Sequence, residues 1–270
     1  MKNFYLLDRN IISIIKESVA GVKQTRKDKL TALANLRKID KKSSVVSPML
    51  SIIEGQSGRK ESSPEVKNTL LKETEAISLF FKNAKVDSKF LTDNSEQVCF
   101  ALSQDIEEKW NDYDSFLKES NNFIFQPVSS KNKIAYEANI ISLAKKHSIN
   151  CGHLVVMICL SCLYGCDTAK KVLKPKKVKK SNYNSLSDIQ LLSRVNRVNA
   201  LIGKYNLKYR TKLLTIDKPL NELQKLIDVL SSDIKSCGTV FSRMSYSASM
   251  FPDLNESEYL SLMERTGAEL

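Results

Sequence analysis

Two aspartates stand at the ends of short apolar runs that are far apart in the chain. Asp8 follows Phe4-Tyr5-Leu6-Leu7, and Asp217 follows Leu213-Leu214-Thr215-Ile216. Continuous apolar runs of this length are typical of strands buried on both faces of a parallel sheet. In open α/β sheets the carboxyl ends of the strands line the ligand crevice. We therefore expect the two carboxylates to meet at one edge of a sheet.

Two further acids belong to the same pattern. Glu54 ends the short helix expected after Ser47-Pro48, and Asp188 opens the helix expected before the strand that leads to Asp217. Four clustered carboxylates without a counterion repel one another, so that some must take up protons. A divalent cation removes that penalty, and hard oxygen ligands with waters suit Mg²⁺ or Mn²⁺. The predicted chemistry is that of a metal site.

Hydrophobic spacing predicts the elements that position these acids. After the first strand the period becomes helical from Ile11, and Val45-Val46 is a second short strand candidate. Residues 61 to about 180 are mostly helical in pattern and contain no convincing alternating strand. Strands and helices then alternate again, with a helix expected over Leu220–Leu230 and a weak strand at 239–241. The order predicts one parallel sheet with right-handed connections, interrupted by a helical insertion.

The motifs around the four acids resemble those of PIN-domain nucleases. Leu6-Leu7-Asp8-Arg9-Asn10-Ile11 is similar to the opening motif of that family, a strand that ends in Asp-x-Asn before an apolar helix. The others are Glu54 after Ser47-Pro48, then Ser187-Asp188-Ile189, then the strand that leads to Asp217. Each motif is short, but four in the expected order on the expected elements are fairly specific.

The resemblance implies an α/β fold, namely a three-layer α/β/α PIN-like domain with a central parallel sheet and a mainly helical insertion. The nuclease core would comprise residues 1–60 and 181–245, and the insertion residues 61–180. Residues 246–270 would form a C-terminal tail.

The resemblance also implies a metal-dependent endoribonuclease, which hydrolyses RNA phosphodiester bonds. The carboxylates carried over as catalytic, metal-binding residues are Asp8, Glu54, Asp188 and Asp217. Asn10 would assist the first acid, and Thr215 would help to fix the end of its strand. Bound Mg²⁺ or Mn²⁺ polarises the scissile phosphate, lowers the pKa of an attacking water and stabilises the leaving oxygen. A role as a toxin or stress effector, an inhibitory protein partner and a homo-oligomer are further expectations.

The sequence departs from the family pattern in two places. Arg9 stands where a small hydroxyl residue is common, and the long insertion leaves Asp167 as a competitor of Asp188 for the third acid. Each acid also has a plain structural interpretation. Asp8 fits a helix cap, and Ser185-x-x-Asp188 fits a capping box.

Composition places the chain among basic globular proteins. Its 270 residues contain 42 Lys and Arg against 30 Asp and Glu, a formal charge of +12. The longest strongly apolar stretch, 154–163, is shorter than the ~20 residues that span a bilayer. We expect a soluble, cytoplasmic protein whose partners do not include a membrane. Its six cysteines would then stay reduced rather than form a disulfide framework.

Two clusters carry further expectations. A lysine run shortly before Asp188 would bring cationic charge to the rim of the acidic site, where an RNA backbone needs it. It comprises Lys174, Lys176, Lys177, Lys179 and Lys180. Cys159, Cys162 and Cys166 share one helical face, but their apolar surroundings favour a core helix over a zinc site. The alternatives to a ribonuclease are a non-catalytic nucleic-acid-binding or scaffold protein with this fold, and a nuclease that acts on DNA.

Overall fold

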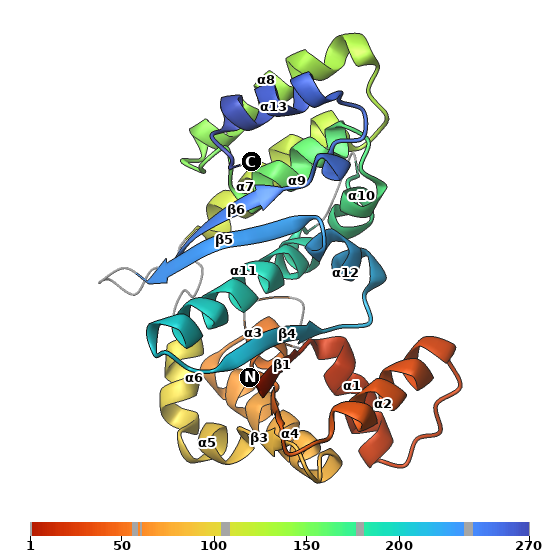
Figure 1. The fold of residues 1–270 in the computed structure, drawn as a ribbon, viewed down its shortest axis with the longest axis vertical. Helices are drawn as coiled ribbons and strands as arrows, with labels where there is room; N and C mark the ends of the chain where they lie inside the picture. The colour runs from red at the N-terminus through yellow and green to blue at the C-terminus, as the bar shows by residue number, and fades with distance from the viewer. Residues whose placement is uncertain are drawn as a thin grey trace. The chain divides into compact units, whose positions relative to one another are not determined.

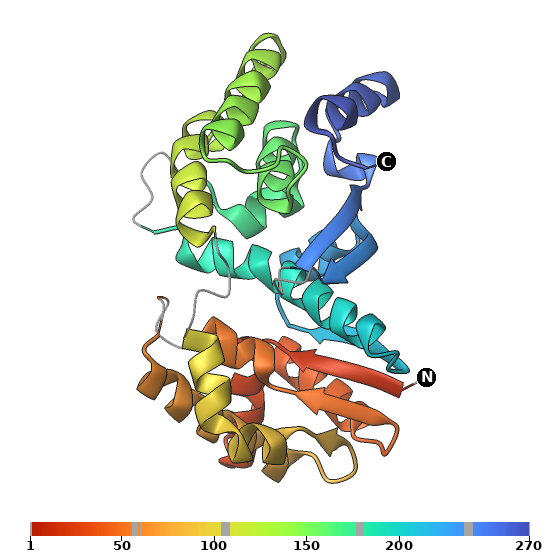
Figure 2. The same ribbon diagram turned by 90° about the vertical axis from the view of Figure 1, so that its left-hand side faces the viewer.

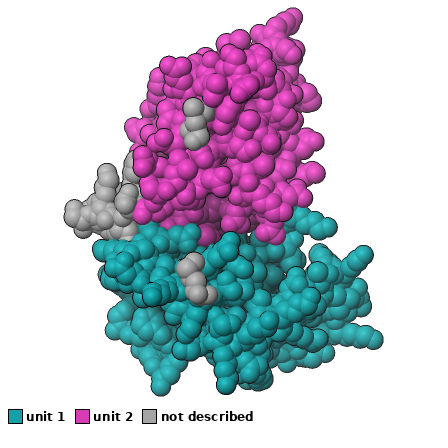
Figure 3. Space-filling view, in the orientation of Figure 1, with its two compact units in different colours: residues 1–108, 197–218 teal, residues 109–196, 219–270 magenta. Residues whose placement is uncertain are grey.

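The computed structural model of the protein describes residues 2–55, 59, 61–103, 109–176, 181–234 and 240–269 (Figure 1). The chain forms two compact units, coloured separately in Figure 3. Unit 1 comprises residues 1–108 and 197–218, and unit 2 comprises residues 109–196 and 219–270. These boundaries differ from the predicted ones. Residues 61–108 belong to unit 1, and residues 181–196 and 219–245 belong to unit 2.

Among the described residues, unit 1 contains a four-stranded parallel sheet, as the apolar runs predict. Its strands are β1 (Lys2–Leu7), β2 (Ser44–Ser47), β3 (Lys85–Val86) and β4 (Tyr209–Leu214), in the order β3-β2-β1-β4. Figure 2 shows β1 and β2 side by side and pointing the same way. Strand β3 lies within residues 61–180, where the sequence shows no alternating strand pattern. A strand of two residues is too short to produce an alternating pattern in the sequence.

Helices flank this sheet, so unit 1 has an α/β architecture. They are α1 (Arg9–Val19), α2 (Lys27–Ile39), α3 (Met49–Glu54), α4 (Ser63–Phe80), α5 (Ser88–Asp93) and α6 (Ser95–Ser103). Local sequence sets their ends. Helix α4 starts with a capping box between Ser62 and Glu65, and α3 stops at Gly55, whose φ of 72° favours glycine.

The two faces of the sheet differ in character. Tyr5, Leu7 and Val46 share one face and pack with α1 and the end of α4 in the main core of the unit. Leu6, Ser47 and Leu213 share the other face. Side chains alternate along a strand. Asp8, two residues after Leu6, and Thr215, two residues after Leu213, therefore belong to this second face.

Unit 2 contains most of the remaining helices and a two-stranded ribbon. Its helices are α7 (Trp110–Ile124), α8 (Ser130–Lys146), α9 (Leu154–Leu163), α10 (Asp167–Leu173), most of α11 (Tyr183–Lys204), α12 (Lys218–Gln224) and α13 (Glu256–Thr266). The antiparallel ribbon pairs β5 (Ile227–Ile234) with β6 (Val240–Tyr246). Across the described residues, no helix is both long enough and apolar enough to cross a membrane.

Two sequence expectations in unit 2 are wrong. The helix expected over Leu220–Leu230 ends at Gln224, because the chain from Ile227 pairs with β6 instead. Residues 246–270 are more than a tail. Helix α13 begins with a capping box between Asn255 and Glu258, and Arg265 of this helix donates hydrogen bonds to the buried carboxylate of Glu137 on α8.

Candidate active site

Asp8 lies between the end of β1 and the start of α1. Its backbone N–H donates to the carbonyl oxygen of Leu214 on β4 at 3.0 Å, and only 2% of the residue is exposed. Its side chain caps α1, because Oδ1 accepts the backbone N–H of Asn10 at 3.3 Å. The side-chain amide of Asn10 also donates to Oδ2 at 3.2 Å. Asp8 is therefore both a helix cap and a buried acid at the carboxyl end of a central strand.

Thr215 joins Asp8 to the end of β4. Its hydroxyl donates to Oδ2 of Asp8 at 2.5 Å and accepts the backbone N–H of Asp217 at 3.0 Å. A buried carboxylate is costly unless hydrogen bonds compensate its charge, and these donors supply that compensation. The structure thus brings Asp8, Thr215 and Asp217 to one edge of the sheet. Asp217 is half-buried there.

Glu54 lies beside this edge, but its charge is met by Arg9. Its Oε1 is 3.3 Å from a guanidinium nitrogen of Arg9, and the Glu54 side chain is almost fully buried. Arg9 also donates to the carbonyl oxygen of Gly55 at 3.1 Å. The residue that departs from the PIN pattern is therefore the one that ties α1 to the end of α3. Glu54 is therefore the anion of an ion pair with Arg9.

Sequence reasoning missed a further acid at this end of the sheet. Asp87 directly follows β3, and its backbone N–H donates to Val46 at 3.4 Å. Since Val86 pairs with Val46, Asp87 lies opposite Ser47, on the face to which Asp8 also belongs. The strand before Asp87 is Lys85-Val86, which contains only one apolar residue and therefore gives no apolar run in the sequence.

The surroundings of Asp87 favour its neutral form. Burial raises the pKa of its carboxyl to about 6, although hydrogen bonds from the Ser47 hydroxyl and from its own backbone N–H act in the opposite direction. The Oδ1 atom is buried and has no hydrogen-bond partner. Asp87 is thus a carboxyl group that changes its charge close to neutral pH.

Glu73 on α4 is a fully buried acid that contacts α3 and α1. Its Oε1 accepts the hydroxyl of Ser51 at 3.0 Å and lies 3.5 Å from the ammonium of Lys16. Burying a carboxylate without such partners is expensive, so this arrangement is what a structural ion pair requires. It joins α1, α3 and α4.

Asp188 belongs to unit 2, whereas Asp8, Glu54 and Asp217 belong to unit 1. It is half-buried on α11, which begins at Tyr183. The capping-box interpretation is wrong, because Ser185 already lies within the helix and its hydroxyl donates to Leu173 at 2.9 Å. Asp167, the competing third acid, begins α10 in the same unit.

The described residues contain no group of three His, Cys, Asp or Glu side chains that could hold a metal ion. The predicted cluster of four carboxylates is therefore not seen among them. The oxygens at the sheet edge still fit one kind of ion. Mg²⁺ commonly takes one or two carboxylates, keeps several waters and completes its shell with substrate phosphates. Asp8 and Asp217, with the Thr215 hydroxyl between them, match that donor set better than a closed protein cage.

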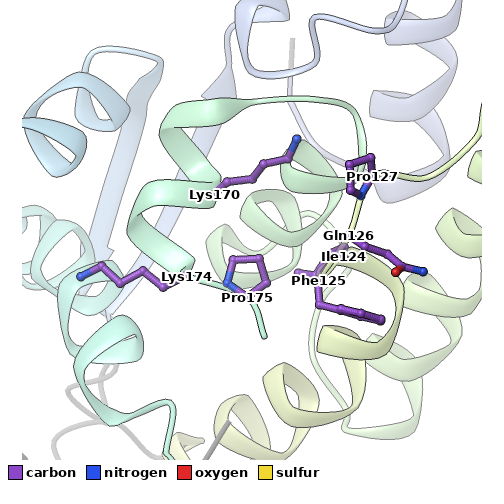
Figure 4. Close-up of a pocket in the computed structure, with 7 residues that line it drawn as sticks. All are labelled: Ile124, Phe125, Gln126, Pro127, Lys170, Lys174 and Pro175. Carbon is purple, nitrogen blue, oxygen red and sulfur yellow. The ribbon is translucent and has the colours of Figure 1, made fainter. Parts of the chain in front are cut away.

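The predicted nucleic-acid-binding lysines fall in unit 2. Lys174 and Lys176 are exposed, while Lys177, Lys179 and Lys180 lie outside the described residues. Lys174 helps to line a hollow of about 280 Å³, seen in Figure 4. Its other lining residues are Ile124, Phe125, Gln126, Pro127, Lys170 and Pro175.

The cysteine-bearing helix is a core helix, as expected. All ten residues of α9 are buried, including Cys159 and Cys162. Burial raises the pKa of the Cys162 thiol well above its ordinary value, so this thiol stays protonated. His153 caps the same helix through Nδ1, which accepts the backbone N–H of Val155 at 3.3 Å.

Comparison of the chain with family models, curated proteins and solved structures found no match.

Proposed function

We propose that this protein is a metal-dependent endoribonuclease whose catalytic edge is formed by Asp8 and Asp217. The observation that carries the proposal is the junction of two sequence-distant strands at a buried carboxylate. Thr215 at the end of β4 holds Asp8 at the end of β1, and Asp217 follows on the same edge. Carboxyl ends of parallel strands are where open α/β sheets bind ligands. The resemblance to PIN-domain nucleases supports the same edge.

The chain's own residues have distinct tasks in this proposal. Asp8 and Asp217 would hold Mg²⁺ or Mn²⁺, which when bound activates a water and polarises the phosphate. Asn10 and Thr215 orient the carboxylate of Asp8 through their hydrogen bonds. Partners of this kind matter because they fix the direction in which a ligand carboxylate points.

Arg9 has a second task. Its side chain is 30% exposed and lies next to Asp8 in the chain, so that its outer N–H groups can meet a substrate phosphate. Glu54 then acts through Arg9 and is a positioning residue in this proposal. The assignment of Asp188 as a further metal ligand stays a prediction, as do the inhibitory partner and the role as a toxin or stress effector.

The test is RNA cleavage with and without divalent metal. Asp8→Asn is the informative variant, because Asn caps a helix about as well as Asp but is a poor metal ligand. We expect metal-dependent cleavage by the native chain, lost in EDTA and reduced roughly 100-fold or more by Asp8→Asn. Asp93→Asn, an exposed acid on α5, is the matched control and should cleave normally. Equal cleavage by both variants would contradict the proposal.

A second candidate is a non-catalytic RNA-binding protein with the same fold. Two observations favour it: within the described residues no three potential ligands gather, and Arg9 already neutralises Glu54. This candidate predicts tight RNA binding without metal, no cleavage, and no effect of Asp8→Asn. Single-stranded DNA offered in the same assay identifies a DNA-directed nuclease, which would cleave it in the presence of metal.

A further inference from the structure

Exposed cations gather at the end of the unit 1 sheet opposite to Asp8, where β2 and β3 begin. They come from two stretches of chain, the end of α2 with the turn before β2, and the turn before β3 with the first residue of that strand. We call this group the basic rim, and its members are Arg37, Lys38, Lys41, Lys42, Lys82 and Lys85. In Figure 2 this is the end at which β1 and β2 start.

Asp40 joins the two stretches. Its carboxylate accepts the backbone N–H groups of Lys82 at 3.0 Å, Asn83 at 2.7 Å and Ala84 at 2.7 Å. Burial opposes the charge of Asp40, but these N–H donors outweigh it, and the pKa of this carboxyl lies below its ordinary value. The single acid in the middle of the rim is therefore ionised and directed at backbone amides. It fixes the two turns without pairing with their lysines.

Within the described residues, the rim cations differ from several other cations of unit 1, which pair with acids. In the described part of the chain, no ion pair joins a rim residue to an Asp or Glu. Elsewhere in the unit Arg26 pairs with Asp28, Lys29 with Glu17 and Lys67 with Glu96. Positive charge is costly to concentrate, because like charges repel. A binding partner with closely spaced negative charges would remove that cost.

The composition of the rim indicates which polyanion fits. The exposed residues between its lysines are polar, namely Ser43 and Asn83. Membrane-surface segments combine their cations with exposed apolar side chains, which insert among the lipids. Contacts to phosphates need only cations and polar donors. The rim therefore matches a nucleic-acid backbone better than a lipid surface.

We infer that the basic rim binds phosphates of the RNA strand at a distance from the cleavage edge. The choice of RNA as the polyanion rests on the proposed function, whereas the inference that the rim binds a polyanion rests on its charges alone. By the strand register, Lys85 is level with Phe4, so the rim begins about 13 Å before Asp8 along the strand direction and extends away from it. Rim contacts should consequently lower KM and leave kcat almost unchanged, because they lie far from the reacting bond.

The test measures RNA binding in EDTA by fluorescence anisotropy, in an Asp8→Asn background that cannot cleave. Lys41→Ala, Lys42→Ala and Lys82→Ala are combined, and the backbone N–H of residue 82 remains available to Asp40. Losing three phosphate contacts should reduce the slope of log K against log salt by about 2 and weaken binding roughly tenfold. The matched control combines Lys72→Ala, Lys131→Ala and Lys145→Ala, which remove equal charge from exposed positions elsewhere. It should change the affinity less than about twofold.

Three results would overturn the inference: unchanged RNA binding in the rim variant, equal weakening in both triple variants, or RNA binding that survives while binding to phosphatidylserine vesicles is lost. Binding needs no cleavage, so a rim that binds RNA in a protein without nuclease activity refutes the proposed function and leaves this inference standing.

Discussion

The hydroxyl of Thr215 donates a 2.5 Å hydrogen bond to the carboxylate of Asp8, a residue 207 positions earlier in the chain. The same hydroxyl accepts the backbone N–H of Asp217. One side chain therefore sets the direction of the first acid and the backbone position of the second. This contact connects the β1–α1 junction with the end of β4, and the proposed activity depends on it.

Replacing Thr215 by Val keeps the side-chain shape and removes the donor to Asp8. We expect a loss of about 1–2 kcal/mol in the free energy of unfolding, because a buried carboxylate loses one of its hydrogen bonds. RNA cleavage should fall by roughly tenfold. Thr211→Val on the same strand is the control, since the Thr211 hydroxyl has no hydrogen-bond partner and its removal should cost nothing. Identical unfolding curves for the two variants would show that the Thr215 contact does not stabilise the edge.

Replacing Arg9 by Met leaves the carboxylate of Glu54 buried without its cation. We expect the free energy of unfolding to fall by about 2 kcal/mol, which is less than for a fully buried pair because Arg9 is partly exposed. Adding Glu54→Gln to Arg9→Met should restore most of the stability, as measured by urea unfolding of all four chains of the cycle. Arg26→Met, which breaks an exposed pair with Asp28, should change little. Additive effects in the Arg9–Glu54 cycle would rule out their coupling.

Asp87 makes the stability of the protein depend on pH in an unusual direction. Its carboxyl has a pKa of about 6 in the folded chain against 3.8 as the ordinary value, so the native state keeps a proton that the unfolded chain has released. This contribution to stability is present at low pH and is lost as the pH rises from about 4 to above 6. Asp87→Asn should therefore be more stable than the native chain at pH 7.5, by about 2 kcal/mol, and equally stable near pH 4.

Thermal unfolding of the Asp87 variant across this pH range checks the prediction, with Asp93→Asn as the control that should follow the native curve. A difference that grows toward low pH would contradict the assigned direction of the shift.

Arg265 tests whether the C-terminal residues belong to the folded core of unit 2. Arg265→Met would leave Glu137 with the Tyr164 hydroxyl, which donates to Oε2 at 2.5 Å. We expect the free energy of unfolding to fall by about 1–2 kcal/mol. The loss is limited because Arg265 is half-exposed, so that water can replace part of its interaction with Glu137. Arg243→Met, whose pair with Glu269 is exposed on both sides, provides the control for unfolding in urea. A loss no larger than that of the control would mean that α13 does not stabilise the unit through Glu137.

Patterns within a few neighbouring residues predicted the parts of the fold that depend on them. The apolar runs before Asp8 and Asp217 do lie in or next to parallel strands, because burial on both faces demands continuous apolar residues. The cysteine helix is buried for the same reason. These features need no information about distant parts of the chain.

Other features depend on tertiary contacts and could not be predicted locally. Strand β3 exists because β2 pairs with it, and so Asp87 was missed. Ile227 and Leu230 continue the helical spacing of Leu220 and Leu223, yet pairing with β6 makes the chain from Ile227 a strand. The ion pair of Glu54 with Arg9 depends on how α1 and α3 meet. Its place in the motif order marked Glu54 as a metal ligand, and only the structure shows which cation lies beside it.

The proposal that Asp8 and Asp217 hold a divalent ion is tested most directly by Mn²⁺ titration of the purified chain, followed by calorimetry in the absence of RNA. The proposal predicts saturable binding that Asp8→Asn and Asp217→Asn each weaken strongly, while Asp93→Asn binds as the native chain does. Mn²⁺ binding that is absent from the native chain, or that is equally strong in all three variants, would contradict it.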